Sequence, residues 1–165
     1  MASGIRYDLV LEDARGGDEY LREIAAHHVS GQLKVAPEHS ERKVLDAMGK
    51  PGHEQLLAFK EKFDRFSKEA GLEQYLTYYL IAAHPGCTQE HMHRLKTFVS
   101  RELHISPEQV QLYTPLPSTY SALMYHTGLD PFTRKPIFVE KDDGKRERQK
   151  RIVTRKPKAG KRKRS

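Results

Sequence analysis

Hydrophobic and polar positions follow two periods along the chain, and these predict strands and helices in turn. Short apolar or alternating runs between breakers predict strands at residues 5–11, 32–36, 75–83 and 110–114. Longer stretches with apolar residues three and four positions apart predict helices at residues 18–28, 40–48, 53–70, 88–103 and 121–127. Strands that alternate with helices are typical of a parallel sheet with right-handed crossovers. We therefore expect an α/β fold of about four βα units.

Breakers and caps define several boundaries of these elements. Asp18 and Thr88 occupy N-cap positions, and Pro37 is expected to end the second strand. Gly71 follows the long helix as a left-handed C-terminal cap. The apolar stripe of that helix is expected to be core: Leu56, Phe59, Phe63 and Phe66.

Positive charge is concentrated at the end of the chain. The net charge is +7, but residues 144–165 carry twelve Lys or Arg and one acid, a balance of +11 that leaves residues 1–143 at −4. Residues 136–140 could add a peripheral strand, residues 145–154 a charged helix, and residues 156–165 a disordered basic tail. Lysine and arginine release counterions from phosphates, so such a tail favours weak, sequence-independent nucleic-acid binding.

Composition narrows the class of protein. At 165 residues the chain is shorter than the ~250 residues of a closed (β/α)₈ barrel. It has no apolar run of the ~20 residues that would span a bilayer, and no signal-peptide pattern, so we expect a cytoplasmic protein without membrane contact. The single cysteine, Cys87, excludes an intrachain disulfide and a cysteine-rich metal site.

Unusual residues follow three of the predicted strands. In parallel α/β sheets, ligands bind where the carboxyl ends of the strands meet. Glu38, His84 and the segment 113–115 are expected to lie on one such rim. The alternative reading treats Glu38 as a cap, His84 as a structural histidine and the neighbouring prolines and glycine as turn residues.

The other candidate residues favour structural roles. His91 and His93 are two positions apart, so they do not share a helix face and are poor zinc ligands. His27 and His28 end a helix, where positive charge is favourable. Cys87 at a predicted helix N-terminus could have a lowered pKa, but no base adjoins it in sequence.

Four segments resemble the later strands of the YgiQ-like radical S-adenosylmethionine (SAM) family. They are SGIRYD (3–8), HHVSGQLKVAPEH (27–39), YYLIAAHPGCT (78–88) and QVQLYTPLPSTYSALMYHTG (109–128), and GKRERQKRIVTRKP (144–157) resembles the end of that family. The resemblance covers about residues 3–156. It implies the C-terminal portion of a partial TIM barrel at residues 1–130, in which the four predicted strands are strands three to six. Residues 131–155 would then be the C-terminal extension of the family.

The resemblance also implies a cofactor-binding set. Glu38 matches a fourth-strand polar residue near the SAM ribose, and Arg6 is a third-strand candidate for the SAM or substrate side. The residues matched to the adenosine are His84, Pro85 and Gly86 in the fifth-strand turn, and Tyr113, Thr114 and Pro115 on the sixth strand. Neither the residues nor the resemblance assigns a catalytic group or a metal ligand.

One departure from the family limits what this chain can do. The CxxxCxxC loop, which binds the 4Fe-4S cluster that reduces SAM, would lie upstream of Met1. We therefore expect the chain alone to be inactive and to pair with the missing N-terminal half of the barrel, because an incomplete barrel exposes a strand edge and apolar interior. A nucleic-acid-associated protein that binds through its basic tail is the alternative. The net-negative body and the tyrosines in predicted strands argue against it.

Overall fold

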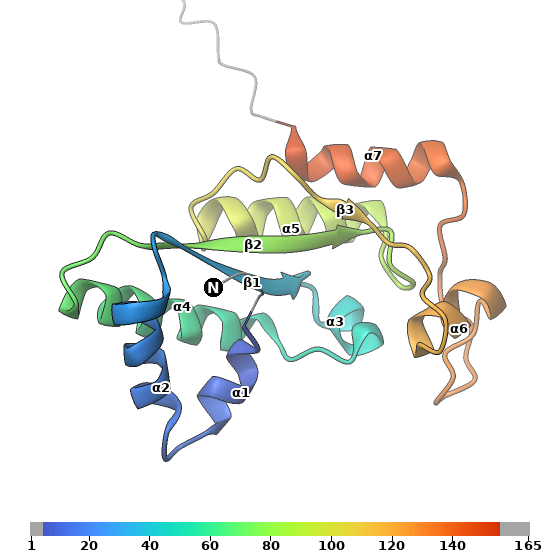
Figure 1. Ribbon diagram of the computed structural model, residues 1–165. Coiled ribbons are helices and arrows are strands. Elements are labelled where there is room, and N and C mark those ends of the chain that lie inside the picture. Colours follow the sequence, from blue (N-terminus) through green and yellow to red (C-terminus); the bar gives the residue numbers. More distant parts are fainter. Residues whose placement is uncertain (1–4, 156–165) are drawn as a thin grey trace, which may run out of the picture.

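The sheet consists of three parallel strands in the order β1–β2–β3 (Figure 1). A computed structural model describes residues 5–155 of the chain. The strands are β1 (Gln32–Glu38), β2 (Tyr75–Ala82) and β3 (Gln111–Leu112). Each connection between neighbouring strands contains a helix, as parallel strands require. The predicted α/β class with a parallel sheet is confirmed.

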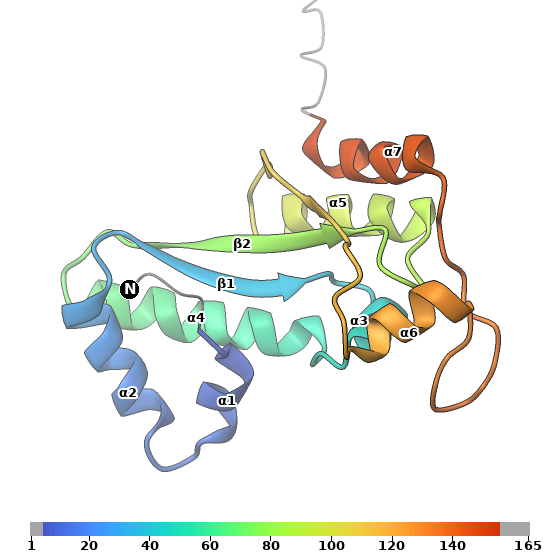
Figure 2. The ribbon, with the colours of Figure 1, turned by 45° about the vertical axis from the view of Figure 1, so that its right-hand side comes forward.

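The described residues form seven α-helices and one π-helical turn. Their bounds are α1 (Tyr7–Glu12), α2 (Gly17–Glu23) continued by the π turn Ile24–His28, α3 (Arg42–Met48), α4 (His53–Glu69), α5 (Gln89–Arg101), α6 (Tyr120–Thr127) and α7 (Asp143–Thr154). In both ribbon views α4 runs along β1, α5 along β2, and α7 beside α5 (Figure 2). Over residues 5–155, no helix is both long and apolar enough to cross a bilayer.

The helices cover one face of the sheet and leave the other open. Leu33 and Val35 of β1 and Leu76 and Leu80 of β2 are buried in a single hydrophobic cluster with the helices. Lys34 of β1 and Thr77, Tyr79 and Ile81 of β2 alternate with these residues and are exposed or half-buried, so they point to the opposite face. The predicted core stripe of α4 lies in the same cluster: Leu56, Phe59, Phe63 and Phe66.

The first predicted strand is wrong. Residues 5–11 contribute one parallel bridge, Ile5 to Val35, and α1 begins at Tyr7. The pattern fits both periods, because Tyr7, Val10 and Leu11 are also three and four positions apart. Burial of Tyr7 and Val10 against α4 selects the helix. The sheet therefore has three strands instead of the four that were expected, and residues 5–11 add only this single bridge.

Other boundaries also differ from the prediction. β1 continues through Pro37 to Glu38, where the register with β2 shifts. β3 has only two residues, and Pro136 of the expected peripheral strand forms a single antiparallel bridge with Leu129. The second helix begins at Gly17 without a side-chain cap, so the N-cap role predicted for Asp18 is wrong.

The cap at Thr88 is confirmed. Its hydroxyl accepts a hydrogen bond from His91 N, and the His91 ring accepts one from Thr88 N. Gly71 has a φ of +71°, as expected for a C-terminal cap. The predicted charged helix is present as α7, whereas the basic tail at residues 156–165 lies outside the described residues.

Candidate functional site

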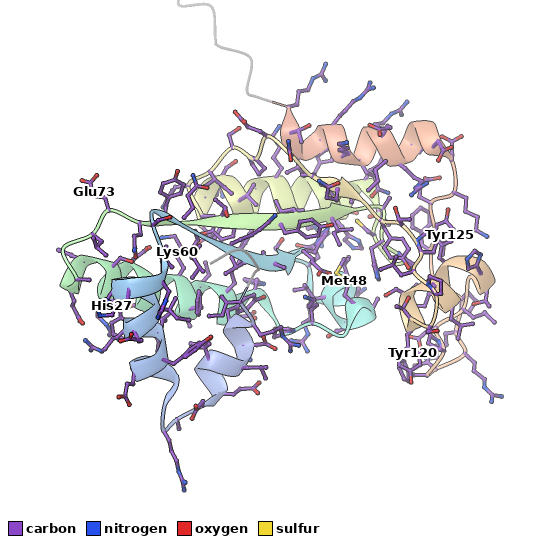
Figure 3. The ribbon with its side chains drawn as sticks, in the orientation of Figure 1. His27, Met48, Lys60, Glu73, Tyr120 and Tyr125 are labelled. Atoms are coloured by element: carbon purple, nitrogen blue, oxygen red, sulfur yellow. The ribbon has the colours of Figure 1, made fainter. Side chains whose placement is uncertain are left out.

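A cavity of about 420 Å³ opens where the carboxyl ends of the three strands meet. It lies on the open face of the sheet, because Tyr79 and Ile81 of β2 line it while their neighbours Leu80 and Ala82 point into the core. Figure 3 shows Met48 at the end of α3, close to the end of β1, and Tyr125 on α6. The other lining residues are Glu38, Met48, His84, Gln111, Leu112, Tyr113, Thr114, Leu116, Thr119 and Ser121.

Glu38 reaches the cavity from an unusual backbone conformation. Its φ is +64°, a left-handed value that is uncommon for a residue with a side chain, and it ends the irregular stretch of β1. Lys50 Nζ lies 3.1 Å from Glu38 Oε1 and 3.4 Å from the Ala36 carbonyl oxygen. The carboxylate is therefore positioned by the strand and neutralised from one side, while its side chain stays 20% exposed.

His84 is held in one orientation by two hydrogen bonds. Its Nδ1 lies 2.8 Å from the Pro85 carbonyl oxygen, which can only accept, so Nδ1 carries the proton. Its Nε2 then accepts from the Ser121 hydroxyl at 2.8 Å. Burial lowers the pKa of His84 to about 4, so the ring is neutral near pH 7. It can orient Ser121 and the Tyr113 ring but supplies no charge.

Tyr113 places its hydroxyl in the buried wall of the cavity. Its ring meets the His84 ring edge-on at 4.8 Å, and its backbone N–H donates to the Ala82 carbonyl at 2.9 Å. Burial raises the pKa of the phenol, which is 8% exposed. The hydroxyl makes no hydrogen bond of ordinary geometry within the described residues, although the Thr119 and Ser121 hydroxyls are close by. A buried hydroxyl without such a hydrogen bond can form one with a polar atom of a ligand.

The structure separates the remaining predicted site residues from this cavity. Gly86 N donates to the Phe138 carbonyl at 2.7 Å, so the Pro85–Gly86 turn faces residues 136–140. Pro115 lines a neighbouring hollow under α6, and Arg6 pairs with Asp8 on the surface. The cavity thus brings together Glu38, His84, Tyr113 and Thr114.

A buried polar chain behind the rim was not expected from the sequence. Gln149 of α7 accepts from Ala83 N through Oε1 and donates to the Cys87 carbonyl, at 3.0 and 3.1 Å. His39 Nδ1 accepts from Glu41 N, so His39 Nε2 donates to Cys87 Sγ at 3.6 Å and the thiol donates to Gln149. The sequence signal that could have identified Gln149 as buried is its position. It lies four residues before Val153, on the same face of α7.

The thiol in this chain of hydrogen bonds is unreactive by its environment. Burial raises the pKa of Cys87 to about 12 and lowers that of His39 to about 3, so neither residue is charged near neutral pH. The lowered cysteine pKa that its position had suggested is contradicted, because Cys87 precedes the cap Thr88 and is fully buried.

The described residues do not form a metal site. Across residues 5–155, no three side chains of histidine, cysteine, aspartate or glutamate gather closely enough to hold a metal ion. The one cysteine of the chain, Cys87, donates a hydrogen bond to Gln149 and is not among the residues that line the cavity. These residues therefore do not fit an iron-sulfur cluster, which requires several accessible thiolates.

The fold and the cavity together define an α/β protein with a ligand-type site at the carboxyl ends of a parallel sheet. Sequence comparison identifies its relatives. The chain is 56% identical over 158 residues to a UPF0313 protein of Fusobacterium nucleatum, which covers 96% of this chain and 28% of the relative. It is 47% identical over 150 residues to a UPF0313 protein of Methanosarcina acetivorans, which covers 91% of this chain and 20% of that relative. The homologues of this chain, over most of its own length, are UPF0313 proteins, that is, proteins of the YgiQ-like family.

The match covers only a small part of each relative. A UPF0313 protein of Geobacter sulfurreducens is 46% identical over 153 residues, covering 93% of this chain and 24% of the relative. The chain thus spans about a quarter of the length of the curated relatives that it matches. No protein-family model and no solved structure matches the chain.

Proposed function

We propose that this chain supplies the adenosyl-binding part of a SAM pocket in a radical SAM protein, as the C-terminal portion of a partial TIM barrel. One observation carries the proposal. Three strand ends that lie far apart in sequence converge on a single cavity of about 420 Å³, within the range of about 300–1,000 Å³ usual for cofactors. In the barrel reading, the open face of the sheet is the barrel interior.

The chemistry of the lining suits an adenosine. The Glu38 carboxylate can accept hydrogen bonds from the two ribose hydroxyls, since Lys50 occupies only one side of it. The Tyr113 hydroxyl, which has no hydrogen bond of ordinary geometry, can donate to a ring nitrogen, and the Tyr79 ring offers an aromatic surface for stacking. His84 stays neutral and holds Ser121 in place, which keeps charge away from the purine.

Radical chemistry requires a cluster that these residues do not fit. In radical SAM proteins the cluster supplies the electron that cleaves the sulfonium. The proposal assigns the cluster to the part of the longer relatives that this chain does not match, and it assigns to this chain only binding and orientation of the adenosyl group. We expect the chain alone, after anaerobic reconstitution, to bind no stoichiometric iron and to leave SAM intact.

The binding proposal is tested by calorimetric titration with S-adenosylhomocysteine, which keeps the adenosine and lacks the sulfonium charge. We expect saturable binding that weakens about tenfold in Glu38→Gln and in Tyr113→Phe, since each variant removes about one ligand hydrogen bond. Glu73→Gln is the control, because Glu73 is exposed and lies at the opposite end of the sheet (Figure 3). Absence of binding, or equal affinity in all four proteins, contradicts the proposal.

A further inference from the structure

A basic groove runs between α5 and α7, away from the cavity at the strand ends. Figures 1 and 2 show α7 lying beside α5, and the groove between them encloses about 570 Å³. Its ionisable lining is entirely cationic or neutral, without a carboxylate. The residues concerned are His93, Lys96, Arg148, Arg151 and Arg155.

The arginines form a stripe along one side of α7. Arg148, Arg151 and Arg155 are three and four positions apart, so their side chains project in nearly the same direction. At 1.5 Å per residue the stripe extends about 10 Å along the helix axis. Gln149 and Val153 occupy the buried side of the same helix, which fixes its rotation and keeps the stripe exposed.

These arginines differ from the surface cations that form ion pairs. Nine lysines and arginines of the described residues pair with carboxylates: Arg6, Arg22, Arg42, Lys50, Lys60, Lys62, Arg65, Arg94 and Arg146. By contrast, Arg148, Arg151 and Arg155 have no carboxylate within 4 Å anywhere in residues 5–155. Lys96 Nζ donates to the Arg155 carbonyl at 2.8 Å, which adds a fourth cation beside the end of the helix. The stripe is a concentration of positive charge without an internal partner.

We propose that the groove between α5 and α7 binds the sugar-phosphate backbone of a nucleic acid. Along the axis of a stacked nucleic-acid helix each strand carries one phosphate per about 3.4 Å, so the stripe of about 10 Å matches the phosphates of about three nucleotides. Arginine presents a planar fork that matches phosphate oxygens in pairs. Six further lysines or arginines follow in residues 156–165, so the chain continues from the groove with the same charge. Contact is to phosphates alone, and binding is independent of base sequence.

The test uses the full chain and a fluorescein-labelled, single-stranded RNA of about 20 uridines, followed by anisotropy at several salt concentrations. The double variant Arg148→Gln with Arg151→Gln should bind about tenfold more weakly at low salt. Its plot of log K against log salt should be shallower by about 1.4, because two phosphate contacts are lost at about 0.7 each. Arg15→Gln with Lys43→Gln is the matched control, since both side chains are exposed, carry the same total charge and lie outside the groove.

Three results would overturn the proposal. The wild-type chain could fail to bind the RNA, the groove variant could bind as tightly as wild type, or the control could lose as much affinity as the groove variant. A competition completes the test: if polyglutamate of equal charge displaces the RNA at equal concentration, the groove recognises acidic protein and the proposal fails. Lys96→Gln provides an independent check and should reduce the slope by about 0.7. Circular dichroism verifies that each variant is folded.

Discussion

Two buried histidines are expected to make the folded protein less stable at low pH. His84 and His39 are 3% and 1% exposed, and burial lowers the pKa of His84 to about 4 and that of His39 to about 3. In the unfolded chain both would titrate near 6.5. Above that pH both states are neutral and the histidines do not change stability with pH. As the pH falls below 6.5, the unfolded chain takes up protons that the folded protein refuses, so stability falls.

We predict that each histidine lowers the free energy of unfolding by about 2 kcal/mol between pH 7 and pH 5. The loss continues until the pH reaches the folded pKa of about 4 for His84. Urea denaturation at pH 7, 6 and 5 measures the effect. In His84→Asn the fall should be about half that of the wild type, because only His39 then contributes.

His27→Asn is the control for this experiment. His27 is 65% exposed and lies on the π-helical turn at the surface (Figure 3), so His27→Asn removes a histidine without changing the buried core. Equal pH dependence in His84→Asn and wild type would show that His84 is free to protonate in the folded protein. The neutral role assigned to it beside Ser121 and Tyr113 would then be wrong.

At the scale of elements, α7 joins the C-terminal segment to the loop that follows β2. Gln149 satisfies the buried Ala83 N–H and Cys87 carbonyl, and Ala83 has a left-handed φ of +59° that needs such support. Arg146 of the same helix donates to the Tyr113 carbonyl at 2.6 Å. One helix therefore holds two of the three strand ends that form the cavity.

We predict that Gln149→Leu destabilises the protein by about 2–5 kcal/mol, because it leaves a buried donor and a buried acceptor unpaired at about 1–3 kcal/mol each. The comparable exposed substitution Gln109→Leu should change stability by less than about 0.5 kcal/mol. Thermal and urea denaturation measure both. A loss below about 1 kcal/mol in Gln149→Leu would mean that water replaces the amide and that α7 does not support the rim.

The elements also show what the sequence could and could not predict. Helices α4 and α5 were predictable because their apolar stripes fit one period over many residues, and Thr88 and Gly71 have plain local signals. The segment at residues 5–11 was not, since seven residues fit two periods and only packing against α4 decides between them. Gln149 could not be assigned either, because its partners lie more than sixty positions away.

The candidate site was predictable in place but not in detail. Strand ends in a parallel sheet must gather at one edge, so the proximity of Glu38, His84 and Tyr113 followed from topology. Which neighbours share the cavity depends on the direction of each turn. Gly86, with a φ of +87°, turns toward Phe138, so Pro85 also faces away from the cavity. No local sequence pattern predicts the direction of this turn.

At the scale of the molecule, the open face of the sheet is the unusual feature. Parallel sheets are normally covered on both faces. Here Tyr75 is 55% exposed, and Tyr79 and Ile81 are half-buried on a face that no helix of residues 5–155 covers. The relatives are about four times longer than the match, and we propose that residues of theirs outside the matched part cover this face as the rest of the barrel.

This proposal predicts that the chain alone is only marginally stable. Hydrogen exchange of the β1 and β2 amides should be at least about tenfold slower in the longer Fusobacterium nucleatum relative than in this chain, since covering the face raises the cost of local opening. Amides at the exposed end of α2, which lies away from the open face, serve as the internal control and should exchange alike in both proteins. The free energy of unfolding of the chain should fall near or below about 5 kcal/mol. A compact monomer by sedimentation, with a free energy of unfolding above about 10 kcal/mol and the same strand exchange as the relative, would show that the open face needs no cover.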